Sequence, residues 1–289
     1  MVKWLAMLAL IVVAIAILNL YLLSISKPFS APPHQRSIIN TSVTTIISSF
    51  VESCIRDSHI IVLVDNNLYR EDLDSSWGLS IYIEVNDIKM LLDTGPNPDV
   101  LERNSRKLGV DLSKIDFIVI SHSHGDHVGG LRYIASINPG VKVFIPPELN
   151  LYYYVKNLGL TPIVINRTTE VVDNVYVIQP LYGPPIEQAL AVKTCNGILI
   201  AVGCSHPRVV NIVKQAMKDI GVEPYIVIGG FHMAGALEQE VEEVVKQLID
   251  LGVKKIYPLH CSGNEVKQYL QTYYSDRYGD GGIGLQIDI

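Results

Sequence analysis

The feature that most constrains this chain is a cluster of potential metal ligands directly after a buried strand. The apolar run Phe117–Ile120 has the length and composition of a strand, and the segment His122-Ser123-His124-Gly125-Asp126-His127 follows it. Six of the eight histidines lie in this segment or in three later loops. Buried imidazoles are costly unless they find partners, whereas imidazole nitrogens and carboxylate oxygens are ordinary ligands of transition metals. The cluster therefore predicts a metal site.

Other chemically active residues also follow predicted strands. They are Asp93, His206, His232 and His260. The loops at strand ends of layered α/β folds gather to form sites. We therefore expect these separate loops to converge on the cluster.

The hydrophobic patterns alternate between strands and helices along the chain. Strands are expected at 59–64, 79–85, 88–92, 117–120, 142–145, 163–165, 175–178, 189–194, 198–202, 225–228 and 255–258. Helices are expected at 99–108, 128–137, 147–158, 207–220, 237–251 and 264–274. This order predicts a layered α/β fold.

The N-terminal segment Trp4–Ile25 holds no charged residue. A helix of this length, at about 1.5 Å per residue, spans the roughly 30 Å hydrocarbon layer of a membrane. A cleaved signal peptide is the alternative, but the apolar run is longer than is usual for one. We expect a single-pass transmembrane anchor over residues 1–26, a proline-containing linker over 27–58 and a catalytic domain over 59–289. Positive residues flank the apolar segment on both sides, so the side of the membrane that holds the domain stays open.

Charge and cysteine content exclude some classes of protein. The formal net charge of −6 gives no general electrostatic reason to bind nucleic acid, so a small-molecule substrate is expected. Four cysteines without CxxC spacing do not indicate a disulfide scaffold. Cys204 and Cys261 lie beside candidate site residues, which makes a reduced state at least as plausible as a bridged one. The sequence leaves the oligomeric state open.

The spacing within the cluster favours two metals. His122 and His124 are two positions apart on an extended segment, so their side chains point the same way and can hold one ion. Asp126 and His127 lie where a helix begins and turn in another direction, which suits a second ion about 3.5–4 Å away. Such a pair makes water nucleophilic near neutral pH and stabilises negative charge on a substrate.

The pattern His122-x-His124-x-Asp126-His127, preceded by a strand that ends in Asp93-Thr94-Gly95, resembles the metallo-β-lactamase superfamily over about residues 59 to 289. The resemblance implies an αββα sandwich with the metals at one edge, between two sheets. It also implies one or two divalent metals, with zinc first and manganese, iron or magnesium as alternatives. The first metal would be held by His122, His124 and His206, and the second by Asp126, His127 and His260. Asp93 would orient the cluster from behind.

A narrower likeness lies in six motifs that are similar to one branch of the superfamily. The first three are Leu63-Val64-Asp65-Asn66, Trp77-Gly78-Leu79-Ser80 and Leu92-Asp93-Thr94-Gly95. The last three are Gly203-Cys204-Ser205-His206-Pro207, Gly229-Gly230-Phe231-His232 and Pro258-Leu259-His260-Cys261-Ser262-Gly263. That branch includes the archaeal enzymes named 7,8-dihydropterin-6-methyl-4-(β-D-ribofuranosyl)aminobenzene-5′-phosphate synthases. The chain departs from the superfamily where most binuclear members carry a bridging aspartate. Either Cys204 substitutes there, or His206 serves alone.

The leading expectation is a metal-dependent hydrolase that uses activated water on a substrate that the sequence does not identify, with phosphate-bearing compounds as one candidate class. Asp126 and His232 are the candidate catalytic residues, His232 as a proton donor or oxyanion partner. The first alternative is a transferase that joins a dihydropterin diphosphate to a ribosyl-aminobenzene phosphate. The second is a non-catalytic, membrane-bound sensor of a metal or ligand.

Overall fold

Strand β1 (Ser58–Val64) shows how the sequence builds the core of this protein. Ile60 and Val62 point into the apolar layer between two sheets, whereas Ile61 and Leu63 pack beneath helices on the outer face. Because successive side chains of a strand point to opposite faces, a continuous apolar run fits a strand that is buried on both sides. The computed structural model describes residues 54–289.

The first sheet has seven strands in the order β13-β1-β2-β3-β4-β5-β6. Strands β3 to β6 are parallel, and β13, β1, β2 and β3 pair antiparallel. After β1, its strands are β2 (Ser80–Val85), β3 (Ile88–Leu92), β4 (Phe117–Val119), β5 (Lys142–Ile145), β6 (Thr161–Val164) and β13 (Gln286–Asp288).

The second sheet has six strands in the order β12-β11-β10-β9-β8-β7. Strands β10, β11 and β12 are parallel to one another, and the rest pair antiparallel. Its strands are β7 (Thr169–Val172), β8 (Val175–Leu181), β9 (Glu187–Thr194), β10 (Gly197–Val202), β11 (Pro224–Gly230) and β12 (Lys255–Leu259).

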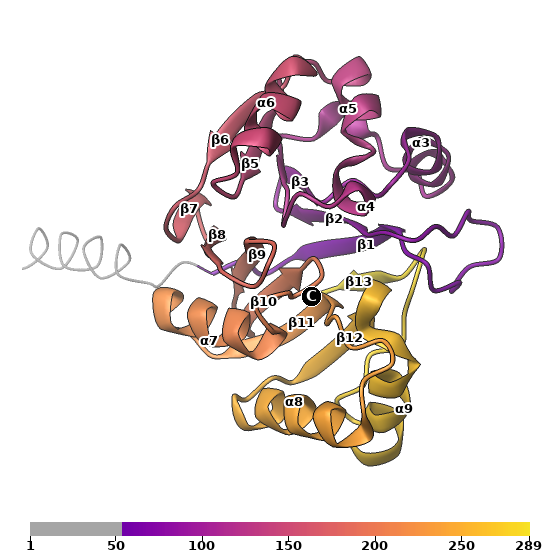
Figure 1. Cartoon of the computed structure of the whole chain (residues 1–289), viewed down its shortest axis with the longest axis vertical. Helices are drawn as coiled ribbons and strands as arrows, with labels where there is room; N and C mark the ends of the chain where they lie inside the picture. Colours follow the sequence, from indigo (N-terminus) through magenta and orange to yellow (C-terminus); the bar gives the residue numbers. More distant parts are fainter. Residues whose placement is uncertain (1–53) are drawn as a thin grey trace, which may run out of the picture. The chain divides into compact units, whose positions relative to one another are not determined.

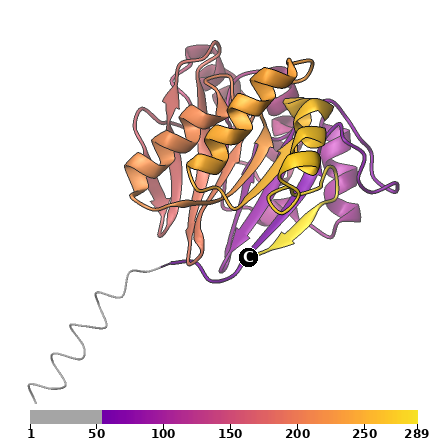
Figure 2. The same cartoon turned by 90° about the horizontal axis from the view of Figure 1, so that it is seen from below.

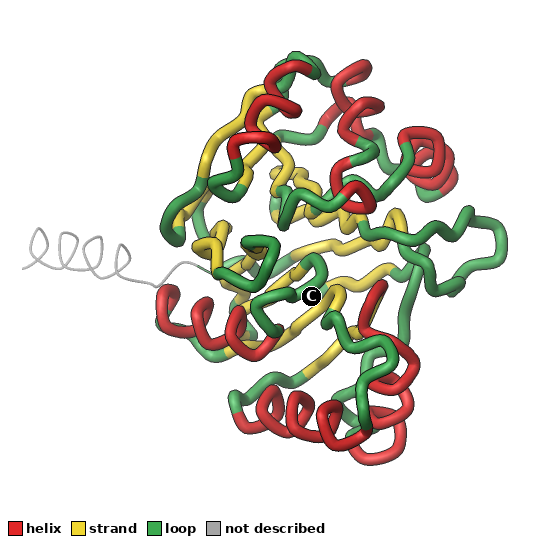
Figure 3. Tube along the Cα trace, in the orientation of Figure 1, coloured by secondary structure: helices red, strands yellow, loops and turns green. Residues whose placement is uncertain are grey.

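Helices cover the outer face of each sheet, so the described residues form four layers (Figures 1 and 3). The first sheet carries α3 (Pro98–Lys107), α5 (Leu131–Ile137) and α6 (Leu149–Asn157). The second carries α7 (Val209–Ile220), α8 (Glu238–Asp250) and α9 (Gly263–Tyr273), which lie across one face in Figure 2. Short helical turns lie at α4 (Gly125–Val128), η1 (Leu112–Lys114) and η2 (His260–Ser262). The predicted αββα sandwich is confirmed.

Two details differ from the sequence prediction. The expected helix over 128–137 is two helices, α4 and α5, separated by Gly129 and Gly130. A side chain at Gly129 would meet the Pro96 carbonyl oxygen at 2.0 Å, so the chain turns where its backbone approaches another backbone closely. The short strands β7 and β13 were not predicted.

The predicted transmembrane anchor, and the linker up to residue 53, lie outside the described residues. From residue 54 onward, no helix combines the length and the apolar character that crossing a membrane requires.

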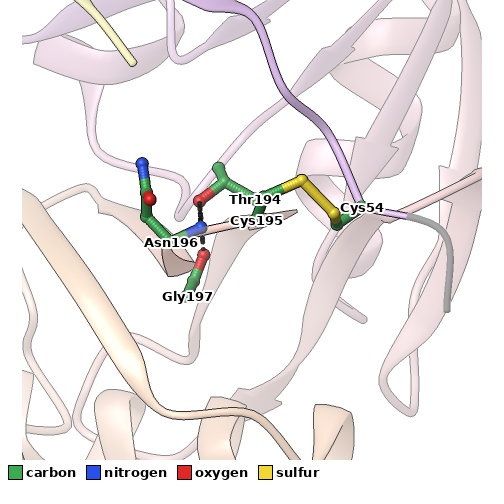
Figure 4. Close-up of a disulfide and its surroundings, with 5 residues drawn as sticks. All are labelled: Cys54, Thr194, Cys195, Asn196 and Gly197. Carbon is green, nitrogen blue, oxygen red and sulfur yellow. Dashed lines mark hydrogen bonds between the residues drawn. A yellow bond between two sulfur atoms is a disulfide. The ribbon is translucent and has the colours of Figure 1, made fainter.

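A disulfide joins Cys54 to Cys195, with the two Cα atoms 5.0 Å apart (Figure 4). It ties the segment before β1 to the turn between β9 and β10. Backbone hydrogen bonds reinforce the attachment, because the Ile55 N–H donates to the Lys193 carbonyl at 3.1 Å and the Cys195 N–H donates to the Ile55 carbonyl at 2.9 Å. Cys204 and Cys261 are free and buried, which agrees with the reduced state expected for them. The bond between Cys54 and Cys195 was not predicted from the sequence.

Candidate metal centre

The candidate site lies where five strands from both sheets end. Asp93 follows β3, and the histidine cluster follows β4. Cys204 and His206 follow β10, whereas His232 follows β11 and His260 begins directly after β12. The ring and hydrogen-bond contacts described below bring together all the site residues predicted from the sequence.

The first predicted donor set is compact. His122 Nε2 lies 3.1 Å from His124 Nδ1, and the His206 ring centroid lies 4.9 Å from that of His122 and 5.0 Å from that of His124. His122 is buried, whereas His124 is exposed. Two imidazole nitrogens this close either share a proton or point their lone pairs at a common cation.

The second predicted donor set adjoins the first. Asp126 Oδ2 lies 3.3 Å from His260 Nε2 and 3.6 Å from His127 Nε2. The rings of His122 and His127 are 4.2 Å apart between centroids, which places the two sets side by side. The two predicted donor sets are therefore adjacent, and the number of ions that they hold stays a prediction.

Asp93 orients the cluster from behind. Its carboxylate is fully buried and accepts hydrogen bonds at 2.7 Å from the Ser121 backbone N–H and from the Ser121 hydroxyl. The same carboxylate lies 2.7 Å from His127 Nδ1. A proton on Nδ1 leaves the Nε2 lone pair of His127 facing the cluster, which is how outer partners prepare a metal-ligating histidine.

Two further histidines are oriented in the same way. His122 Nδ1 lies 2.8 Å from the Ser121 hydroxyl, whose own proton is donated to Asp93. His260 Nδ1 lies 2.8 Å from Asn66 Oδ1. The ring nitrogens of His122, His127 and His260 that face away from the cluster therefore all have partners.

Two buried carboxylates hold the loops that deliver these ligands. Asp65 accepts the His260 N–H at 3.2 Å and also caps its own turn by accepting the Asn67 N–H at 2.8 Å. Glu187, at the start of β9, accepts three backbone N–H groups of the loop Cys204-Ser205-His206 at 2.8–2.9 Å. Burial raises the pKa of Glu187 to about 7, against the opposing effect of those N–H groups.

The role of Glu187 was not predicted from the sequence, because nothing local links it to a loop seventeen positions away. Ser121 and Asn66 were also missed as histidine partners. Ser121 carries a usable signal, since it stands between a predicted strand and the first ligand.

The electrostatics of His122, His206 and Asp126 favour the protonation states that metal ligation requires. Burial, together with neighbouring imidazoles, moves the pKa of His122 far below its usual range and lowers the pKa of His206 to about 4. Burial would raise the pKa of Asp126, but its hydrogen bond with His260 and its proximity to His127 lower that pKa to about 2. Burial opposes charge on His127, yet the adjacent Asp93 carboxylate raises the pKa of His127. A bound cation would displace the proton that this raised pKa favours on His127.

Backbone strain concentrates at this edge. Most of the non-glycine residues with positive φ in the described chain lie here, and they are Asp93 (57°), Ser205 (63°), Arg208 (73°), His232 (54°) and His260 (48°). Such conformations cost about 1–3 kcal/mol each and persist where the surroundings impose them, often at functional sites.

The residues present fit a divalent transition metal. His206 Nε2 is buried and has no hydrogen-bond partner, although a buried polar nitrogen without a partner is costly. The ligand atoms of His122, Cys204 and His206 lie within 4.8 Å of one another, as do those of His127, Cys204 and His260. Imidazole and thiolate donors of this kind suit zinc and its neighbours better than magnesium or calcium.

A cavity of about 310 Å³ opens beside the first donor set. Its walls include His206, Arg208, Phe231, His232 and Met233. The His232 ring is exposed and lies 4.4 Å from the His206 ring between centroids. His232 is therefore in a position to contact a molecule that enters the cavity.

Trp77 lies on the side of the second donor set. Its ring centroid is 4.9 Å from that of His260, and the residue is 58% exposed. An exposed tryptophan beside a polar cluster offers an apolar surface for a substrate. It was not singled out as a site residue from the sequence.

Comparisons with known proteins agree with this geometry. Residues 78–154 match the metallo-β-lactamase superfamily. The chain is 28% identical to a protein of Methanocaldococcus jannaschii named 7,8-dihydropterin-6-methyl-4-(β-D-ribofuranosyl)-aminobenzene-5′-phosphate synthase, over 73% of this chain and 89% of that one. It is also 27% identical to a metal-dependent hydrolase of Pyrococcus abyssi, over 52% of this chain and 68% of the relative.

A solved structure gives the same result for the fold. The crystal structure of a metal-dependent hydrolase of the β-lactamase superfamily superposes with a TM-score of 0.69 at 27% identity, covering 80% of this chain and 99% of that chain. The relatives with named activities are enzymes. This chain therefore has the metallo-β-lactamase fold and carries a match to that superfamily over residues 78–154, and its named relatives are enzymes.

Proposed function

We propose that this protein is a metal-dependent hydrolase that cleaves its substrate with a metal-activated water at the edge between its two sheets. The observation that carries the proposal is the orientation of His122, His127 and His260. Each has its Nδ1 paired outside the cluster and its Nε2 directed inward. Hydrolase relatives support the reaction class.

His122, His124 and His206 would hold one ion, and Asp126, His127 and His260 the other. When bound, such ions acidify water and offset negative charge that develops on a substrate. Phosphate-bearing compounds are one substrate class that this chemistry suits.

The protein's own residues have distinct tasks in this proposal. Asp93 keeps His127 in one tautomer and orientation. Asp126 is anionic and its side chain is 22% exposed, so it is able to contact both an ion and the substrate side. His232, at the mouth of the cavity, supplies a proton to the leaving group.

Metal content and turnover of the full-length protein, purified in detergent, test this function. We expect at least about one equivalent of bound zinc, manganese or iron after reconstitution, and hydrolysis of at least one compound in a panel of phosphodiesters, lactones and thioesters. The change His122→Ala should abolish both. The matched control His59→Ala removes a histidine near the start of β1 that pairs with Asp288 at 2.6 Å, and it should change neither. Less than about half an equivalent of metal in the wild type, or full activity of His122→Ala, contradicts the proposal.

The second candidate is the pterin transferase, and the 28% identical synthase supports it. In that reaction the ions would stabilise a departing diphosphate. Adding the dihydropterin diphosphate and the ribosyl-aminobenzene phosphate to the same assay separates the two functions. Formation of the condensed product favours the transferase, and hydrolysis of the panel without that product removes it.

We also propose that residues 4–25 anchor the protein in a membrane as a single span. The Cys54–Cys195 disulfide supports a domain on the oxidising side of that membrane, because such bonds persist in oxidising compartments. Cys195 precedes β10 and Cys204 follows it, so the length of that strand separates the disulfide from the candidate site. Protease added to intact cells should digest the domain, and its complete protection would refute the orientation.

A further inference from the structure

Cys204 lies at the junction of the two donor sets. It follows β10, it is 4% exposed, and its Sγ is 3.2 Å from His127 Nε2. It also belongs to each of the three groups of potential ligands among the described residues: one with His122 and His206, one with His127 and His260, and one with His232 and Cys261.

The separation of these atoms suits common ligation of a metal. Zn–S bonds of about 2.3 Å and Zn–N bonds of about 2.1 Å in a tetrahedral site put sulfur and nitrogen ligand atoms roughly 3.6 Å apart. The 3.2 Å between Cys204 Sγ and His127 Nε2 is close to that value. His127 Nδ1 is already paired with Asp93, so Nε2 is the nitrogen that remains for a metal.

Among the described residues, the carboxylates near this loop already have other partners. Asp93 pairs with Ser121 and His127. The Glu187 carboxylate is committed to the N–H groups of Cys204, Ser205 and His206. Asp126 lies toward His260 and His127, in the second set.

The loop that carries Cys204 is held firmly. In addition to the three bonds to Glu187, the Ser205 hydroxyl donates to the Gly230 carbonyl at 2.7 Å. A side chain at Gly203 would meet the Ser121 hydroxyl at 2.1 Å, so the loop packs directly against the residue that orients His122. These contacts fix the sulfur over the cluster before any ligand is present.

We propose that Cys204 is a metal ligand whose thiolate bridges the two ions. The inference rests on the metal site of the proposed function, and it adds a bridging ligand and a preference among cations. On binding, the S–H bond breaks, the proton leaves to solvent, and sulfur lone pairs form the two metal–sulfur bonds without any change in oxidation state. A soft thiolate at the centre selects zinc, cobalt or ferrous iron over magnesium and manganese.

Cobalt titration of the metal-free, full-length protein tests the bridge, because a thiolate bound to Co²⁺ gives an intense near-ultraviolet charge-transfer band that imidazole and carboxylate ligands lack. We expect the band to grow through both the first and the second equivalent of cobalt. It should be absent from Cys204→Ser and Cys204→Asp. Cys204→Asp should still bind two equivalents, because an aspartate supplies another anionic bridging donor.

Cys261 offers the matched control. It is a second buried free thiol, and its Sγ donates to the Cys204 carbonyl at 3.8 Å. Cys261→Ser should keep the band at full intensity, and circular dichroism should show that all the variants are folded.

Several outcomes would overturn the bridge. They are two bound equivalents of cobalt without the band, a band that persists in Cys204→Ser, a band that disappears in Cys261→Ser, and a band that saturates at one equivalent while a second ion binds. A wild-type protein that binds no cobalt would instead refute the metal site of the proposed function. The two failures are therefore distinguishable.

Discussion

Glu187 is expected to stabilise both the fold and the ligand loop. Its carboxylate is fully buried and accepts three backbone N–H groups of the loop Cys204-Ser205-His206. A buried donor that loses its acceptor costs roughly 1–3 kcal/mol. Three such donors share one side chain, so Glu187→Ala should reduce the free energy of unfolding by about 3–9 kcal/mol.

Glu187→Gln removes the charge of this side chain while keeping nearly the same shape. The amide retains one acceptor oxygen but directs an NH₂ group at the remaining backbone N–H. We expect a loss of about 1–3 kcal/mol, together with a metal affinity that is 10- to 100-fold lower, as is typical when a partner behind the ligands is changed.

Guanidinium unfolding of the metal-free protein, followed by circular dichroism, measures the first effect, and equilibrium competition with a chelator measures the second. Glu170→Gln is the matched control, because Glu170 lies in β7 of the same sheet, is exposed, and accepts a backbone N–H from Asn174 at 2.8 Å. It should cost less than about 1 kcal/mol. A cost for Glu187→Ala no greater than that of the control would refute the reasoning.

Three further predictions follow from packing, cross-linking and ligation. Gly129→Ala should destabilise the protein by more than about 2 kcal/mol in thermal unfolding, because its Cβ would meet the Pro96 carbonyl oxygen at 2.0 Å. The control is Gly125→Ala, inside the histidine motif. A Cβ there has open space around it, so this change should be neutral within about 0.5 kcal/mol. Replacing both Cys54 and Cys195 with serine should lower the free energy of unfolding by about 2–5 kcal/mol, since the cross-link spans 141 positions; an unchanged denaturation midpoint would contradict this. Free metal at 100 times its Kd should stabilise the reconstituted protein by about 2.7 kcal/mol, measured as a fall in Tm on chelation, and an unaltered Tm would show that the ligands hold no ion.

The strands could be predicted because their burial is visible in their composition. In β1, β4 and β10, apolar residues run continuously, which fits strands covered on both faces. The short strands β7 and β13 lack such runs, and each is the outermost strand of its sheet. Half-exposed edge strands bury too few side chains to produce a clear pattern.

The candidate ligands could be recognised from the sequence where they lie close together, but the residues that hydrogen-bond to them could not. His122, His124, Asp126 and His127 lie within six positions, so their spacing carries the signal. The partner of His260 Nδ1 is Asn66, which is 194 positions away.

The Asp65-Asn66 pair shows why a local interpretation can be incomplete. An Asp-Asn pair favours a turn, and Asp65 caps its turn by accepting the Asn67 N–H. The same carboxylate also holds the His260 backbone N–H, which only the three-dimensional fold reveals. Local propensity and a tertiary contact are satisfied by one side chain.

A charge count shows how a cysteine at position 204, where most binuclear members of the superfamily carry a bridging aspartate, would affect the site. The donor set contains five neutral imidazoles and the Asp126 carboxylate, and without a further anion two divalent ions would leave an excess of three positive charges. A Cys204 thiolate reduces the excess to two, which equals what a bridging aspartate would give. A bridging thiolate and a bridging aspartate therefore carry the same charge, but the thiolate is the softer ligand. If the bridge is a thiolate, Cys204→Asp should preserve the attraction for an anionic substrate while shifting metal preference from zinc toward manganese; a variant that keeps the wild-type order of metal affinities would show that the sulfur does not touch the ions.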